Sequence, residues 1–280
     1  MWMLLVLLYG VLKGAREILK KKALEKNNVM EVLFFYTLFG FILVSPDAPN
    51  AMGLPVKYYF FIAIKSFVIF LAWICSFKAI KKMPISIYGI LDLSRVLFAT
   101  MLGIVVLGET LGIYQTIGLL LVSGGLLLLK YKKNSESTRE EVPARYVIFA
   151  FASCMLNALS GLLDKILMKD VSSSQLQFWY MLFLVSFYGL YILVSRTKIR
   201  WQACKSGWIW LLSILFIIAD RAIFVANADS ASKVTVMTLI KQSGCIVTIL
   251  AGKFIFKEKN IGYKLFCAGV IIAGIVVAVL

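Results

Sequence analysis

Residues 84–107 read PISIYGILDLSRVLFATMLGIVVL, an apolar run that carries a carboxylate, Asp92, and a guanidinium, Arg95, near its centre. The run is long enough for one helix to cross a bilayer, which takes about 20 residues. A charge at the bilayer centre costs roughly 2.5–3.5 kcal/mol even on a lenient insertion scale. Such residues face a bundle interior or a wet cavity, so the stretch predicts a membrane-spanning helix with a functional inner face.

The whole chain has the composition of a polytopic helical membrane protein. It has 280 residues, 61% of them hydrophobic, and a mean hydropathy of +0.90. No water-soluble domain of this size needs so much apolar surface. A net charge of +16 would suggest nucleic acid for a soluble chain, but here the basic residues cluster at the ends of apolar runs. We therefore expect an all-α protein in the lipid bilayer, with no nucleic-acid partner.

Ten hydrophobic spans are predicted along the chain. They lie near residues 2–20, 29–45, 57–80, 84–107, 112–130, 145–168, 174–195, 206–228, 231–252 and 261–280. The only long polar stretch is Tyr131–Ala144, YKKNSESTREEVPA. We interpret it as a linker (131–144) between two five-helix halves, residues 1–130 and 145–280.

The two halves resemble each other. Corresponding residues of the first and sixth spans follow the i, i+3, i+4, i+7 spacing of one helix face: Gly10, Lys13, Gly14 and Glu17 in the first, and Asn157, Ser160, Gly161 and Asp164 in the sixth. An odd number of spans in each half forces the halves into opposite orientations. The pattern thus predicts two inverted repeats, with a binding site at their interface near the midplane.

Lysine and arginine predict the orientation of these spans. The odd-numbered loops carry nearly all of them, whereas the even-numbered loops carry only Lys57, Lys169 and Lys233. The positive-inside rule then places the odd-numbered loops in the cytoplasm and both termini outside the cell membrane.

Two stretches carry a resemblance to a known family. From Phe77 the chain reads FKAIKKMPIS, continues with LDLSRVLFATMLGIVVLGETLGIYQTIGLLLVSGGLLLL, and from Thr238 it reads TLIKQSGCIVTILAGKFIFKEKNIGYKLFCAGVIIAGIVV. Together with the duplicated plan, they resemble the EamA type of the drug/metabolite transporter superfamily. The resemblance implies ten helices and the transport of a small molecule.

The chain departs from the family pattern where the family binds substrate. Arg95 stands where the family often has proline, and Lys13-Gly14 replaces an aromatic–glycine pair. The segment Ile240-Lys241-Gln242 is similar to the basic pair of the superfamily's sugar-phosphate translocators, with Gln242 in place of the second basic residue.

The intramembrane charges are the main candidates for a binding site. Cations outnumber anions by seven to four: Lys13, Arg16, Lys65, Arg95, Lys165, Arg221 and Lys241 against Glu17, Asp92, Asp164 and Asp220. Structural roles compete with function. Lys13 could pair with Glu17 and Asp92 with Arg95 along one helix, Lys65 could pair with Asp92, and Lys65 and Lys165 could snorkel to an interface.

Four of these residues have more specific expectations. We favour function for the central Arg95 and Lys241. Asp220 and Arg221 point about 100° apart on one helix, so each is expected to have a partner on another helix.

Other side chains complete the candidate list. Trp73 and Tyr88 could stack on a substrate ring or hold a cation, or simply pack. The five cysteines lack metal-ligand spacing and histidine is absent. We expect no metal, no cofactor and no enzyme activity, because no catalytic motif is present.

Three functions remain open. The leading hypothesis is a secondary transporter of a small polar, anion-bearing metabolite, with Arg95 and Lys241 binding its negative group. Asp92 or Asp220 would hold an ammonium or carry a coupling proton. The runner-up is an exporter of cationic or aromatic amines or of amino acids, which would use Asp92, Glu17 and the aromatic residues. The third is a non-transporting membrane subunit or sensor with a static charge network. The oligomeric state is left open.

Overall fold

The structure, a computed structural model, describes residues 2–107, 112–131, 142–229, 237, 240–258 and 261–279. These residues form helices and connecting turns without a strand, which confirms the predicted all-α fold class. Residues 132–141 of the predicted linker and residues 231–236, 238 and 239 of the predicted ninth span lie outside them. The helices are α1 (Trp2–Lys26), α2 (Val29–Val44), η1 (Ser45–Asp47), α3 (Ala48–Ala51), α4 (Val56–Lys82), α5 (Ile85–Asp92), α6 (Arg95–Leu107), α7 (Ile113–Tyr131), α8 (Ala144–Leu167), α9 (Ser173–Ser195), η3 (Trp201–Lys205), α10 (Gly207–Ala228), α12 (Gly244–Phe254) and α13 (Ile261–Val279).

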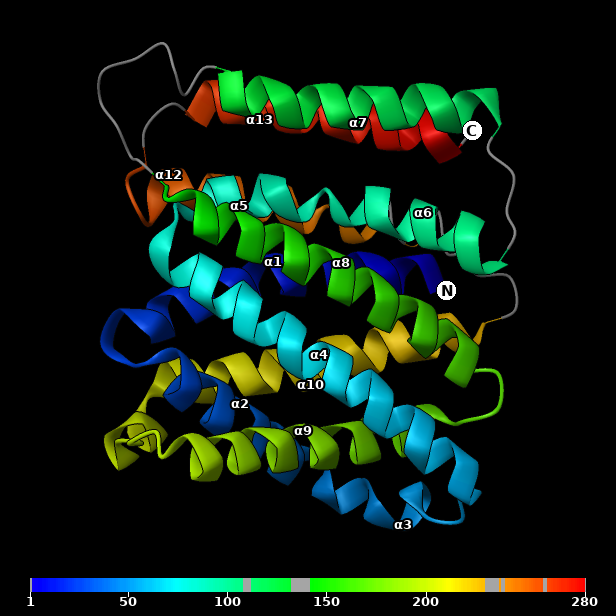
Figure 1. Cartoon of the computed structure of the whole chain (residues 1–280), viewed down its shortest axis with the longest axis vertical. Helices are drawn as coiled ribbons and strands as arrows, with labels where there is room; N and C mark the ends of the chain where they lie inside the picture. Colours follow the sequence, from blue (N-terminus) through cyan, green and yellow to red (C-terminus); the bar gives the residue numbers. More distant parts are fainter. Residues whose placement is uncertain are drawn as a thin grey trace.

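The long helices run back and forth across one bundle (Figure 1). Both chain ends lie at one end of the bundle, on the right in Figure 1, which we call the terminal end. We call the opposite end, where α1, α4, α9 and α12 end, the basic end. It carries most of the described cations of the loops and helix ends: Lys20, Lys21, Lys22, Lys26, Lys78, Lys81, Lys82, Arg196, Lys198, Arg200, Lys205, Lys253 and Lys257.

Six described stretches are long and apolar enough to cross a membrane. They are Val29–Ala51, Val56–Lys82, Ile85–Leu102, Ala144–Leu167, Ser173–Ser195 and Gly207–Ala228, and they correspond to six of the ten predicted spans. The apolar parts of α7, α12 and α13 are shorter, at 10–17 residues. Helix α1 has the length, but Lys13, Arg16, Glu17 and Lys20 interrupt its apolar run. The protein is thus a multi-pass membrane protein.

The helix ends follow local chemistry. Before α2, Asn28 and Glu31 form a capping box, and Glu31 is then held by Arg200 from the loop before α10. The two side chains make paired contacts at 3.0 and 3.1 Å. These hydrogen bonds, which Arg200 donates to the Glu31 carboxylate, raise the pKa of Arg200, a residue outside the candidate spans. The contact ties α2 to the start of α10 at the basic end.

The fourth predicted span is broken, contrary to the expectation of one continuous run. Helix α5 ends at Asp92 and α6 begins at Arg95, and the turn between them uses the tighter i to i−3 hydrogen bonds. A second break precedes α12, at Gln242–Ser243. The same three bonds recur at matching positions: Ser94 to Leu91, Val96 to Leu93 and Leu97 to Ser94, and Ser243 to Ile240, Cys245 to Gln242 and Ile246 to Ser243, each from N–H to carbonyl at 2.9–3.2 Å.

Glycines bring α1 close to the second break. A Cβ added to Gly14 would lie 2.7 Å from the carbonyl oxygen of Gly244, and one added to Gly244 would lie 2.6 Å from that of Gly10. The Gly10-x-x-x-Gly14 motif therefore lets neighbouring helices approach within one chain, as predicted.

Helices of the two halves pack on each other in a paired pattern. Helix α1 packs on α10 and α12, while α8 packs on α4 and α6. Helix α2 packs on α9, and α7 packs on α13 to form the uppermost layer in Figure 1. The interior of the bundle is therefore formed by contacts between residues 1–131 and residues 142–279.

Candidate functional site

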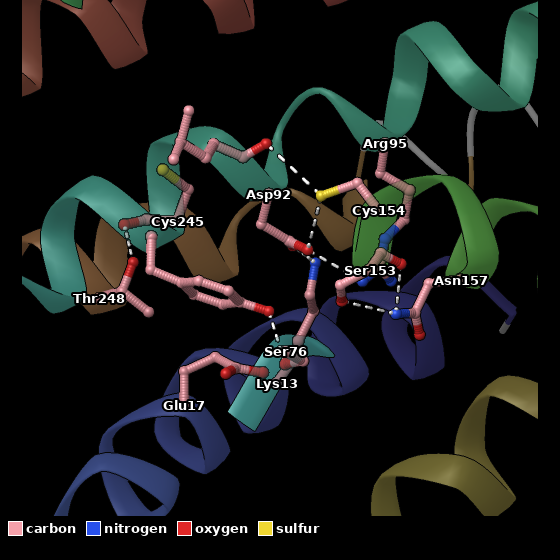
Figure 2. Close-up of polar contacts among 12 residues, drawn as sticks. Lys13, Glu17, Ser76, Asp92, Arg95, Ser153, Cys154, Asn157, Cys245 and Thr248 are labelled. Carbon is pink, nitrogen blue, oxygen red and sulfur yellow. Dashed lines mark hydrogen bonds and ion pairs between the residues drawn. The ribbon is translucent and has the colours of Figure 1, made fainter. Parts of the chain in front are cut away.

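The first break carries a carboxylate between two cations. Lys13 of α1 places its Nζ 2.5 Å from Oδ2 of Asp92, and Arg95 places Nη2 2.9 Å from Oδ1. The thiol of Cys154, from α8, lies 3.8 Å from the same Oδ1 (Figure 2). Lys13 and Asp92 are only 7% and 6% exposed. The predicted Asp92–Arg95 pair is confirmed, and Lys13 joins it.

The second break carries a further cation. Lys241 lies 5.7 Å over the ring of Tyr9, and it makes no ion pair with any residue that the structure describes. Its strongest electrostatic interaction with a charged residue is with Asp164, followed by Arg95, Lys13 and Asp220. We call Lys13, Asp92, Arg95 and Lys241 the break cluster. These four residues are three cations and one carboxylate, and the carboxylates of Asp164 and Asp220 also act on Lys241.

A second group of buried charges is balanced. Arg16 of α1 lies 3.5 Å from Oδ1 of Asp220 in α10, and Lys65 of α4 lies 3.1 Å from Oδ1 of Asp164 in α8. Tyr180 of α9 joins the two pairs, since its hydroxyl donates to Oδ2 of Asp220 at 3.4 Å and its ring lies 3.4 Å below the Lys65 ammonium. We call these five residues the cross-helix cluster.

Aromatic rings surround part of these charges. Trp73 packs against Tyr36 and Phe216, with ring centroids 5.1 and 5.2 Å apart. The guanidinium of Arg16 lies 5.1 Å over Phe216. Trp73 therefore packs on the same ring, Phe216, that lies under the Arg16 guanidinium. Tyr88, one turn before Asp92 on α5, exchanges a hydrogen bond of 2.7 Å with Ser76.

Two pairings that the sequence left open do not form. Glu17 pairs with Lys20 at 2.7 Å rather than with Lys13, because Lys13 forms an ion pair with Asp92 of a neighbouring helix. Lys65 pairs with Asp164 rather than with Asp92, because α4 packs along α8.

The remaining candidates, Arg221 and Gln242, lie in α10 and at the second break. Arg221 donates to Ser174 of α9 at 2.7 Å and pairs with Asp47 of η1. With Asp220 bound to α1 and α9, each residue of this adjacent pair has its partner on another element, as expected. Gln242 is 2% exposed and forms part of the second break.

Two residues of the site, Cys154 and Tyr180, were not candidates from the sequence. Cys154 is one of five cysteines without metal-ligand spacing, and Tyr180 is one of 12 tyrosines with no distinguishing pattern. Arg16 was a candidate only as one of the intramembrane cations, without an expected partner. Their roles depend on which helices touch, which hydropathy does not reveal.

The break cluster has the chemistry of an anion site. Ammonium and guanidinium groups bind carboxylate or phosphate oxygens through charge-assisted hydrogen bonds, and Arg does so with two parallel donors. Among the described residues, no three His, Cys, Asp or Glu side chains gather in a way that could hold a metal ion.

Comparisons with known proteins address the family and the fold. Residues 1–131, which contain Lys13, Asp92 and Arg95, match the model of the EamA-like transporter family. This match confirms the EamA-type resemblance over these residues, and members of that family are transporters rather than enzymes.

The other two comparisons address the whole chain. No curated protein matches. A solved structure given as "Crystal structure of protein" matches with a TM-score of 0.68 and 14% identity, covering 100% of this chain and 96% of the other. At that identity the match supports a shared fold alone.

Proposed function

We propose that the protein is a secondary transporter that moves a small polar, anion-bearing metabolite across the cell membrane by alternating access. The observation that carries this proposal is the break cluster, in which Lys13 and Arg95 share the carboxylate of Asp92, and Lys241 forms no ion pair with a described residue. Unpaired positive charge within a membrane bundle is costly and attracts an anion. A substrate carboxylate or phosphate would complete the balance.

The architecture of the proposed transporter is ten spans in two inverted repeats, residues 1–130 and 145–280, joined by the linker 131–144. The matching hydrogen bonds of the two breaks support this plan, as does the exchange of packing partners between α1 with α10 and α8 with α4. Transporters of this build bind substrate at broken helices near the repeat interface. Lys13 and Lys241 come from different repeats and meet at this place.

The ion pairs of Asp92 could couple substrate binding to the conformational change. In this structure its two oxygens each contact one cation, as the oxygens of a bound carboxylate would. A substrate anion that took over Lys13 or Arg95 would loosen the hold of α1 on the α5–α6 break. Either Asp92 or Asp220 could then accept a coupling proton, since a carboxylate that loses its cation in a buried site favours the neutral form.

The orientation of the bundle follows from the loops. We propose that the basic end faces the cytoplasm and the terminal end faces outward, because Lys and Arg accumulate in cytoplasmic loops. The substrate would then pass between these two ends through the break cluster.

A second candidate, export of a cationic or aromatic amine, has one observation in its favour. The ammonium of Lys65 lies against the ring of Tyr180 at 3.4 Å, beside the carboxylate of Asp164. An aromatic face with a carboxylate is the kind of site that holds an amine. In this structure the chain's own lysine occupies it.

Competition by matched analogues tests the choice between these functions. Ligands are first found by a thermal-shift screen of the purified protein against metabolites, since a ligand that binds only the folded state raises the midpoint. Anionic, zwitterionic and cationic analogues then compete with them. We expect ligands with a carboxylate or phosphate, and we expect Arg95→Gln to weaken binding about tenfold more than Asp92→Asn. A preference for amines that lack an acid group, with Asp92→Asn the more damaging change, would support the amine exporter.

The third hypothesis, a non-transporting subunit or sensor, predicts that ligands bind without being transported. Its charges would form a static network, so reconstituted vesicles would show no uptake of any ligand that the screen identifies. Uptake that depends on Arg95 would exclude it.

A further inference from the structure

Glu258, in the turn after α12, caps a helix of the other half of the chain. Its Oε1 accepts the N–H of Ile85 at 2.7 Å, and its Oε2 accepts the N–H of Ser86 at 3.3 Å and the Ser86 hydroxyl. Lys264 of α13 lies 3.2 Å from Oε2, and the Glu258 and Lys264 side chains are only 6% and 8% exposed. One buried carboxylate thus binds the first two amides of α5.

The backbone after α12 directs Glu258 at α5. Lys257 adopts a left-handed conformation, with φ of 51°, and the N–H of Glu258 then returns to the carbonyl oxygen of Gly252 at 2.8 Å. A Cβ at Gly252 would lie 2.9 Å from Oε2 of Glu258 and 3.2 Å from Cβ of Ser86. The turn therefore fits the carboxylate tightly against α5, and a larger residue at position 252 would displace it.

Helix α5 connects this cap to the break cluster. It is eight residues long, about 12 Å, with Glu258 at its first turn and Asp92 at its last residue. All of its residues except Ile87 are buried. Gly89 lies so close to Thr248 of α12 that no Cβ would fit between them. Any separation of α5 from α12 at the basic end must therefore break the cap, and it would also move Asp92.

We propose that Glu258 is a latch that holds the basic end closed along the seam between α5 and α12, and that the pathway opens to this end only when Glu258 leaves α5. The inference rests on the proposed alternating-access function and adds a positioning residue to it. The charge of Glu258 acts on the amide dipoles at the start of α5, where an anion is favourable.

Labelling of Cys154 tests the latch. Cys154 is fully buried beside Asp92, so a variant that keeps only this cysteine reports access to the break cluster. An impermeant thiol reagent is applied to vesicles of each orientation, one exposing the basic end and the other the terminal end. We expect Glu258→Gln to raise the labelling rate from the basic end at least about tenfold and to lower it from the terminal end, because charge-assisted hydrogen bonds are lost.

A matched control separates the latch from surface charge. Glu25→Gln removes the same charge near the same end, where Glu25 pairs with Lys22 within α1 at 2.9 Å, and it should leave both rates unchanged. Should Glu258→Gln not fold, Ser86→Ala removes one donor of the cap and should change the rates in the same direction by a smaller factor.

The outcomes distinguish the two levels of the proposal. Equal increases from both ends would mean that the bundle has merely loosened, which would overturn the latch. The parent protein could be labelled at Cys154 from both ends, with a ratio of the two rates that Glu258→Gln does not change. That result would overturn the latch and leave alternating access intact. Labelling from one end or neither in every variant would overturn both.

Discussion

The break cluster and the cross-helix cluster use the same residue types but differ in charge balance. The cross-helix cluster pairs Arg16 with Asp220 and Lys65 with Asp164, one cation for each carboxylate. In the break cluster, Lys13 and Arg95 share Asp92, and Lys241 has no carboxylate in contact among the described residues. A balanced network can hold helices together without a ligand. A network with surplus charge is costly until an anion arrives. From this comparison we propose that the cross-helix cluster is structural and that the break cluster binds substrate.

The largest expected effect is on the stability of the cross-helix cluster. Asp164→Asn should lower the free energy of unfolding by about 3–5 kcal/mol, because it leaves the Lys65 charge buried without its partner. Thermal unfolding of the purified variant in detergent measures this. Asp170→Asn, an exposed change just beyond α8, is the control and should have little effect.

A double variant sharpens the first prediction. Lys65→Met with Asp164→Leu removes both charges, so most of the lost stability should return. If Asp164→Asn is as stable as Asp170→Asn, the cross-helix cluster does not hold the bundle together, and the contrast between the two clusters fails.

The second expected effect concerns binding rather than stability. Lys241→Gln should weaken an anionic ligand by about 10- to 100-fold, the range for losing a charge-assisted hydrogen bond. The unfolding midpoint should stay close to that of the parent, because Lys241 forms no ion pair with any residue that the structure describes. Ligand titration beside thermal unfolding measures both quantities, with the exposed Lys169→Gln as the control. A large loss of stability with unchanged affinity would place Lys241 in a structural role.

The contrast between the clusters was only partly predictable from the sequence. Runs of apolar residues identify the spans, and the charges within them identify candidates such as Asp92, Arg95 and Lys241. The break itself gave no signal, because Leu93-Ser94 contains neither glycine nor proline, the usual markers of an interrupted helix.

Partners on other helices were also beyond the sequence pattern. Spacing along one helix suggested Lys13 with Glu17, yet Asp92 lies at 2.5 Å from Lys13 after folding. Spacing describes neighbours on one helix, whereas a buried charge takes the best partner from any helix that touches it. Only the pairing of α1, α4, α8 and α10 reveals which partners are available.

The smallest expected effect is that of surface cysteines. They test which end of the bundle, and so which side of the two clusters, faces the cytoplasm. In a background without native cysteines, Asn50→Cys should react with an impermeant thiol reagent in intact cells, and Lys198→Cys should be protected, with stability and binding unchanged. Asn50 lies in α3 at the terminal end, and Lys198 lies between α9 and η3 at the basic end; both are exposed, so reactivity depends on sidedness alone. A cysteine at Asn134, outside the described residues, should behave like that at Lys198. Reaction at positions 134 and 198 with protection at position 50 would reverse the orientation, and the Glu258 latch would then close the outer end instead.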